Sequence, residues 1–95
     1  MKIDVGCGIY CNKGYEGVDR KKWNNKVKYI IDLELQELPF KENSIDEIIC
    51  YNTLEHLNNP AKVIAQFFKI LKKGMKAKII VPYFRHFTSY NPEHK

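Results

Sequence analysis

Long hydrophobic runs are missing from this sequence. No apolar run approaches the roughly 20 residues that a membrane-spanning helix requires. The first four residues, Met1-Lys2-Ile3-Asp4, also lack the hydrophobic stretch of a signal peptide. These absences argue against a membrane protein and against secretion, so we expect a cytoplasmic location.

Cysteine is scarce as well, with three residues, Cys7, Cys11 and Cys50. An odd number of cysteines without a secretory signal argues against a disulfide framework. A zinc site is the alternative, because Cys7 and Cys11 lie close together and the chain has the histidines His56, His86 and His94. The paired Cys-x-x-Cys knuckles of zinc modules are absent, however, so we expect no metal and buried or half-buried free thiols.

The length of 95 residues limits the chain to one small domain, because such a domain buries only about 60 to 65% of the surface exposed by its unfolded chain. With 44% hydrophobic residues and no long low-complexity tract, the composition is that of a globular protein. We therefore predict a single domain over residues 1–95.

Five short apolar runs, several rich in β-branched residues, predict β-strands at residues 2–5, 15–19, 27–32, 45–51 and 77–81. A helix is predicted between the last two, because Asn58 or Asn59 can cap it and Pro60 suits its first turn. Its apolar residues recur at helical spacing: Val63, Ile64, Phe67, Phe68 and Leu71. Lys72 and Lys73 favour the negative end of this helix, and Gly74 supplies a left-handed stop.

This alternation of strand and helix is typical of an α/β fold in which the fourth and fifth strands are parallel neighbours. A short helical turn is expected at residues 53–57. The connections before residues 15 and 27 span only six and seven residues, too few for a helical crossover of about a dozen, so we expect loops there. Residues 85–95 show no clear period and are predicted to form an irregular tail.

Gly6 and Gly8 follow the first predicted strand directly. Glycines at this place let the backbone approach a ligand closely, because no Cβ obstructs it and a positive φ costs little. A dinucleotide-binding fingerprint would require a third glycine three positions later, where this chain has Cys11. The pair therefore indicates a ligand loop and argues against NAD.

Aspartates end the second and third predicted strands, Asp19 and Asp32. At the carboxyl ends of parallel strands, a carboxylate can accept hydrogen bonds from ribose hydroxyls. Asp32 offers the same geometry to an adenine amino group, and Leu33 can pack on the ring. Each aspartate alone could be a simple turn residue, but their common position predicts a nucleoside-type site.

Seven short motifs then extend the pattern: Asp-Val-Gly-Cys-Gly at 4–8, Gly-Val-Asp at 17–19, Asp-Leu at 32–33, Leu-Pro-Phe at 38–40, Ser-Ile-Asp-Glu-Ile at 44–48, Leu-Glu-His-Leu at 54–57 and Leu-Lys-Lys-Gly at 71–74. In this order they resemble the motifs of class I, methyltransferase type 11-like S-adenosylmethionine-dependent methyltransferases. The resemblance implies a Rossmann-like, mostly parallel sheet with strand order 3-2-1-4-5 and S-adenosylmethionine across the strand ends. It also implies a truncated domain that lacks the family's last two strands and its first helix.

The resemblance assigns nine residues to the cofactor: Gly6, Cys7 and Gly8 beside the methionine, Asp4 fixing this loop or contacting the methionine amino group, Asp19 at the ribose, Asp32 and Leu33 at the adenine, and Tyr51 and Asn52 beside the transferable methyl. Methyl transfer is an in-line displacement, for which positioning supplies much of the acceleration. Glu55 and His56 are candidate bases for acceptors that need one, with His56 as the catalytic candidate. His56 could equally orient the loop before the helix.

The sequence thus predicts a methyltransferase, or its cofactor-binding half, with an unidentified acceptor. One alternative is a non-catalytic S-adenosylmethionine-binding module that serves as a partner or scaffold. Another is a different nucleotide-binding α/β protein, disfavoured by Cys11 and by the absence of a Walker lysine pattern.

The sequence says less about the binding partners of this protein than about its fold. The net charge of +5 comes with two groups of lysines, Lys21, Lys22, Lys26 and Lys28 in one and Lys69, Lys72, Lys73, Lys76 and Lys78 in the other. Such groups can attract phosphate, which keeps RNA open as an acceptor, but they also suit an ordinary solvated face. The edge strand at 77–81 would be uncovered, so we expect a homodimer through this edge or through the aromatic residues Tyr83, Phe84, Phe87 and Tyr90.

Overall fold

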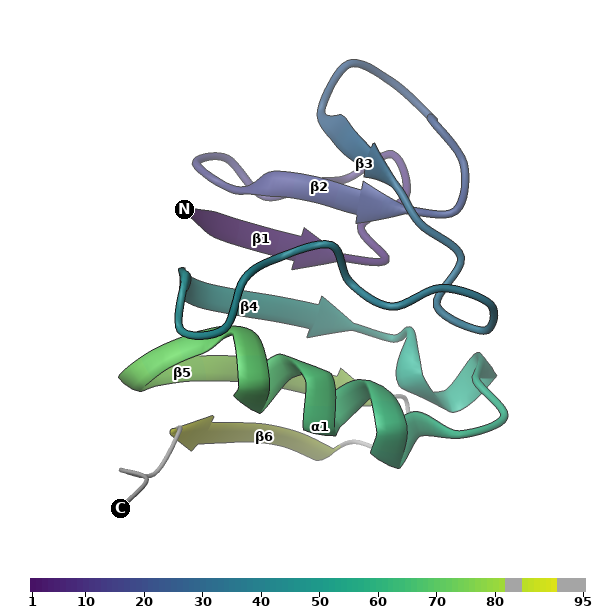
Figure 1. The fold of residues 1–95 in the computed structure, drawn as a ribbon. Helices are drawn as coiled ribbons and strands as arrows, with labels where there is room; N and C mark the ends of the chain where they lie inside the picture. Colours follow the sequence, from purple (N-terminus) through teal and green to yellow (C-terminus); the bar gives the residue numbers. More distant parts are fainter. Residues whose placement is uncertain (82–84, 91–95) are drawn as a thin grey trace.

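The computed structural model describes residues 1–81 and, for the backbone only, residues 85–90. These residues form a six-stranded sheet with the order β3-β2-β1-β4-β5-β6 (Figure 1). Its strands are β1 (Lys2–Val5), β2 (Glu16–Asp19), β3 (Val27–Ile30), β4 (Ile45–Tyr51), β5 (Leu71–Val81) and β6 (Arg85–Tyr90). A 3₁₀ turn, η1 (Leu54–His56), and one helix, α1 (Pro60–Ile70), connect β4 to β5.

The first five strands are parallel and confirm the predicted Rossmann-like order 3-2-1-4-5. β1 lies between β2 and β4, and its register with β4 pairs Ile3 with Ile48 and Val5 with Cys50. The short connections before β2 and β3 contain no helix, as predicted. All five parallel strands therefore end at one edge of the sheet.

The core lies between the sheet and α1. Asn59 caps the helix by accepting a hydrogen bond from the backbone N–H of Lys62, and Pro60 occupies the first turn. The helix buries an apolar stripe of Val63, Phe67 and Ile70 against the sheet. The segment of residues 31–44 runs over the same face of the sheet (Figure 1), and its Leu38 N–H donates to Gln66 Oε1 of α1 over 2.8 Å.

The end of α1 differs from the prediction. The helix stops at Ile70, and Leu71 is extended and fully buried where it pairs with Ile45 of β4. The register then shifts before Lys76 pairs with Glu47, which leaves a bulge in β5. Gly74 does adopt a left-handed conformation, with φ of 79°, but it serves this bulge instead of a helix stop. Burial of Leu71 in the sheet outweighs the helical periodicity that includes it.

The predicted irregular tail over residues 85–95 is wrong for its first part. β6 pairs with β5 in antiparallel register, from Val81 opposite Arg85 to Lys76 opposite Tyr90. It satisfies the backbone groups of the β5 edge, so the expectation of an uncovered edge at residues 77–81 is wrong, and the homodimer expected there no longer has that edge as its support. Tyr83, Phe84 and residues 91–95 lie outside the described residues, and a dimer by another surface stays a prediction.

The prediction of free thiols fails for two of the three cysteines. Cys7 and Cys11 form a disulfide, because the turn between them brings their Cα atoms to 4.7 Å, within the usual range of about 4.4–6.8 Å. Both sulfur atoms pack against Gly17, where an added Cβ would lie 2.7 Å and 2.8 Å from them. Cys50 is free and buried, and burial raises the pKa of its thiol to about 12.

Within residues 1–81, no group of three potential ligands is close enough to hold a metal ion. His94 lies outside the described residues, and the side chain of His86 is not described. No described helix combines the length and the apolar character that a membrane crossing demands. The cytoplasmic location stays a prediction.

Gly6 and Gly8 allow a matched test of the packing at the end of β1. Both have positive φ, 72° and 60°, but a Cβ at Gly6 would lie 2.1 Å from Thr53 Oγ1, whereas one at Gly8 would meet nothing within 4 Å. We expect Gly8→Ala to lower the free energy of unfolding by about 1–2 kcal/mol for the left-handed backbone. Gly6→Ala should lower the free energy of unfolding by about 1–3 kcal/mol more than Gly8→Ala does, because its Cβ overpacks the contact with Thr53. Urea unfolding followed by circular dichroism measures both, and equal losses would contradict this packing.

Candidate functional site

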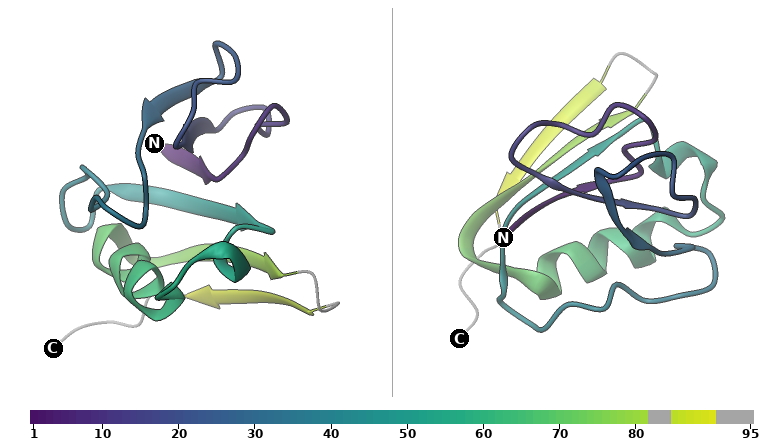
Figure 2. Two further views of the ribbon diagram at one scale, coloured as in Figure 1. Left: turned by 90° about the vertical axis from the view of Figure 1, so that its right-hand side faces the viewer. Right: turned by 90° about the horizontal axis from the view of Figure 1, so that it is seen from above.

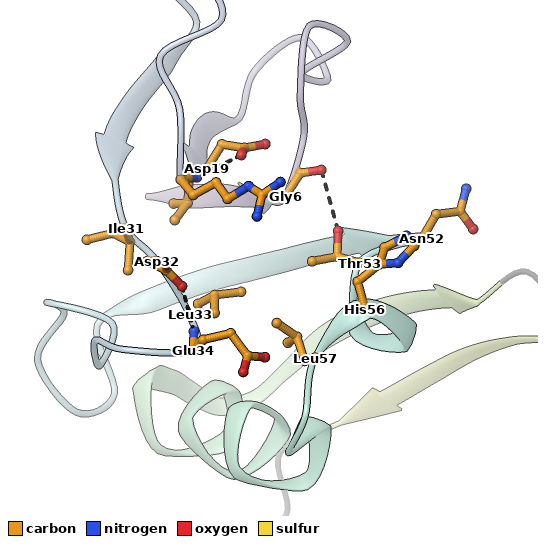
Figure 3. Close-up of a pocket in the computed structure, with 12 residues that line it drawn as sticks. Gly6, Asp19, Ile31, Asp32, Leu33, Glu34, Asn52, Thr53, His56 and Leu57 are labelled. Atoms are coloured by element: carbon orange, nitrogen blue, oxygen red, sulfur yellow. Dashed lines mark hydrogen bonds between the residues drawn. The ribbon is translucent and has the colours of Figure 1, made fainter.

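A cavity of about 260 Å³ opens at the carboxyl ends of β1, β2, β3 and β4 (Figure 3). Its walls come from four separate segments, each of which follows one of these strands. The lining residues are Gly6, Val18, Asp19, Arg20, Ile31, Asp32, Leu33, Glu34, Asn52, Thr53, His56 and Leu57. In an open α/β sheet, the crevice beyond these strand ends is the usual place for a ligand.

The glycine loop after β1 is held from two sides. The Gly6 N–H donates to the Val18 carbonyl over 2.6 Å, and the Gly8 N–H donates to Asp19 Oδ2 over 2.8 Å. Asp4 is 2% exposed, and its Oδ2 accepts hydrogen bonds of 2.8 Å from both the backbone N–H and the side-chain amide of Asn12. Asp4 thus braces the loop, which is one of the two roles predicted for it.

Asp19 links the glycine loop to the segment after β2. One carboxylate oxygen accepts from Gly8, and the other accepts from the Arg20 N–H over 2.7 Å. A carboxylate has about four acceptor positions, so two amide donors leave capacity for further hydrogen bonds. Asp19 is only partly buried and lines the cavity, where hydroxyl groups of a ligand could donate to it.

The segment after β3 forms the wall opposite the glycine loop. Asp32 Oδ1 accepts from the Glu34 N–H over 2.9 Å, which fixes the carboxylate beside Leu33 (Figure 3). Glu34 in turn accepts hydrogen bonds of 2.8 Å from the backbone N–H and the side-chain amide of Asn58. The wall after β3 is therefore tied to the loop that leads into α1.

The apolar part of the cavity comes from Ile31, Leu33 and Leu57. Ile31 is buried, and Leu33 and Leu57 pack against the main core cluster. Apolar side chains beside two carboxylates suit a ligand with a flat apolar ring and polar substituents.

The segment after β4 carries the remaining polar groups. Asn52 has a positive φ of 52°, and its N–H donates to the Ile80 carbonyl over 2.7 Å. The side chain of His56 is 77% exposed, and its Nε2 lies 3.6 Å from Glu55 Oε2. The Glu55 side chain is 12% exposed, and its Oε1 has no hydrogen-bond partner among the described residues. Of the two candidate bases, only His56 lines the cavity.

The structure brings together six of the ten predicted site residues at the cavity: Gly6, Asp19, Asp32, Leu33, Asn52 and His56. Four do not line it, namely Asp4, Cys7, Gly8 and Tyr51, although Gly8 donates to Asp19, which does, and Asp4 braces the glycine loop through Asn12. Six further residues line the cavity that were not predicted from the sequence: Val18, Arg20, Ile31, Glu34, Thr53 and Leu57. All six flank a predicted residue, so extending each predicted motif by one position would have named them.

S-adenosylmethionine fits the residues that are present. The positive φ of Gly8 comes with open space where a Cβ would stand, so the backbone of the glycine loop is accessible to a ligand. Asp19 and Asp32 supply acceptors for ribose and adenine donors, and the apolar wall supplies a surface for the ring.

Comparison with known proteins supports this assignment at the level of the family. The family described as a methyltransferase domain matches residues 11–77. An uncharacterized protein of Methanocaldococcus jannaschii is 31% identical over an alignment that covers 85% of this chain and 39% of that protein. The chain thus spans about two fifths of the length of this curated relative.

Among solved structures, the crystal structure of the [4+2]-cyclase SpnF is similar, with a TM-score of 0.64 and 18% sequence identity. The match covers 82% of this chain and 37% of that chain. At this identity the likeness bears on the fold alone. The profile match over more than two thirds of the sequence, together with the strand-end cavity, shows that this chain belongs to the methyltransferase domain family.

Proposed function

We propose that the cavity binds S-adenosylmethionine and that the chain is the cofactor-binding part of a methyltransferase. The observation that carries the proposal is the convergence of the glycine loop, Asp19 and Asp32 on one cavity from three consecutive strands. Membership of the methyltransferase domain family supports the choice of this cofactor over other nucleosides.

Each wall has a part in holding the cofactor. The backbone of Gly6 and Gly8 would lie beside the methionine portion, since both positive φ values and the close approach of Thr53 to Gly6 require glycine in this loop. Asp19 would accept hydrogen bonds from the ribose, and Asp32 from the adenine amino group, with Leu33 against the ring. The bound cofactor supplies a methyl group on a sulfonium, whose loss leaves a neutral thioether.

The protein's contribution to methyl transfer is mainly positioning. Holding two reactants in line supplies up to about 7–11 kcal/mol of a barrier, without any covalent help from the protein. Asn52 and His56 border the cavity on the β4 side, where an acceptor would approach. The exposed His56 ring is free to take a proton from an acceptor that must lose one, and Glu55 lies beside it.

A non-catalytic binding module is the second candidate. One observation keeps it open: a similar fold occurs in a protein described as a cyclase, so this fold is not confined to methyl transfer. Such a module would keep the cofactor site and leave the acceptor site to another chain or segment. Production of S-adenosylhomocysteine from S-adenosylmethionine in the presence of cell extract separates the two candidates.

Replacing Asp19 tests the cofactor site. Asp19→Asn removes the charge that would receive the ribose hydroxyls, and hydrogen bonds to charged groups contribute about 1.5–3 kcal/mol. We therefore expect about 10- to 100-fold weaker binding of S-adenosylhomocysteine in calorimetric titration. Asp46→Asn is the matched control, because Asp46 lies near the amino end of β4, at the opposite edge of the sheet. The proposal would be contradicted by equal affinities of the two variants, or by a folded wild-type protein that binds neither S-adenosylmethionine nor S-adenosylhomocysteine.

Replacing His56 tests its role as a base. His56→Gln should slow S-adenosylhomocysteine production by about 10²- to 10⁴-fold if a positioned base is required. Its affinity for S-adenosylhomocysteine should stay at the wild-type value, because the amide keeps the shape of the wall. Parallel loss of affinity and rate would instead assign His56 to support of the loop, and an unchanged rate would exclude both roles.

A further inference from the structure

Three large side chains that no described element covers lie on the two loops beside the cavity. Tyr10 is 83% exposed, Ile9 49% and Trp23 47%. Ile9 and Tyr10 belong to the loop after β1, and Trp23 belongs to the loop after β2. Clustered exposed apolar groups of this size mark surfaces that meet a partner.

The two loops lie side by side (Figure 2), although Tyr10 and Trp23 are thirteen positions apart. The Asn24 side-chain amide donates to the Ile9 carbonyl over 3.1 Å, which joins the loops directly. The Cys7–Cys11 disulfide closes the turn that carries Tyr10, and Asp4 holds the Asn12 that follows it. The rings are therefore presented by braced loops, which lowers the entropic cost of binding on them.

The same surface is strongly basic. Residues 9–28 contain six cations and two carboxylates, a net charge of +4 out of +5 for the whole chain. All six cations are exposed: Lys13, Arg20, Lys21, Lys22, Lys26 and Lys28. The Lys21 ammonium lies 4.4 Å from the centre of the Trp23 ring. Six cations against two carboxylates leave this part of the chain positively charged.

We propose that this surface, formed by residues 9–13 and 20–26, binds single-stranded nucleic acid. Exposed aromatic rings among lysines are the arrangement that such binding uses, because bases stack on the rings while cations neutralise the phosphates. An acidic peptide would satisfy the lysines and leave Tyr10 and Trp23 without a flat partner. A duplex keeps its base faces stacked inside, so it would not cover the rings either.

The surface adjoins the cavity through Arg20. This residue lines the cavity and also begins the basic run of Arg20, Lys21 and Lys22. A strand bound on the loops would therefore pass the mouth of the cavity. Binding to the loops needs no cofactor, so it is measured without one, and its outcome is independent of the proposed methyltransferase function.

Trp23 is the only tryptophan in the chain, so it reports directly on stacking. Titration with oligouridylate and oligothymidylate of twelve nucleotides should quench its fluorescence. Anisotropy of the labelled oligonucleotides should show about 5- to 100-fold weaker binding by Tyr10→Ala, which removes one stacking ring. The ratio of the affinities for oligouridylate and oligothymidylate distinguishes RNA from DNA as the ligand, since the two oligonucleotides differ only in the 2′-hydroxyl and the thymine methyl.

The double substitution of Lys21→Ala and Lys22→Ala should flatten the slope of log K against log salt by about 1.4, or 0.7 for each lost phosphate contact. The matched control replaces Lys72 and Lys73 with alanine, which removes the same charge at the start of β5. Equal effects of the two pairs would overturn the proposal. Binding of polyglutamate as tightly as of the oligonucleotides, without a need for Tyr10, would assign the surface to acidic proteins instead. An absence of binding at low salt would also overturn it.

Discussion

The parallel pairing of β1 with β4 is the constraint on which the rest of this structure depends. It places β1 between β2 and β4, so that the strand order reverses beside β1. The loops after β1 and β2 then lead away on one side and the segment after β4 on the other, which leaves a crevice at the strand ends. The buried contact of Ile3 and Val5 with Ile48 and Cys50 holds this pairing. A shift in the register of β1 with β4 would separate the glycine loop from Thr53 and remove the cavity.

Local signals were sufficient for much of the fold. β4 has the predicted bounds, because its short segment rich in isoleucine is flanked by polar turn residues, a pattern typical of a buried strand. Of the features that sequence reasoning got wrong, two depend on distant partners and one on the exact geometry of a turn. Leu71 leaves the helix because its side chain is buried opposite Ile45, and β6 forms because β5 offers an edge to pair with. The Cys7–Cys11 disulfide depends on how tightly the glycine loop turns.

In the candidate site, too, local signals predict some residues and packing decides others. Gly6, Asp19 and Asp32 were predictable because residues at the ends of parallel strands meet whatever the intervening chain does. Thr53 and Leu57 each adjoin a predicted residue, but which neighbours face the cavity depends on how η1 packs. The likeness to a protein described as a [4+2]-cyclase also shows that this fold alone does not determine the reaction. Methyl transfer is therefore proposed from the family and the cavity together, and not from the fold.

The most direct test of the central claim is a titration of the isotopically labelled protein with S-adenosylhomocysteine, followed by amide chemical shifts. The account predicts saturable shifts at the four segments that line the cavity, around Gly6, Asp19, Asp32 and Asn52. Amides near the amino ends of the strands, such as those of Ile45 and Asp46, should stay in place. Shifts centred on the amino ends, or a folded protein whose spectrum does not change, would contradict a cofactor site at the carboxyl ends of β1 to β4.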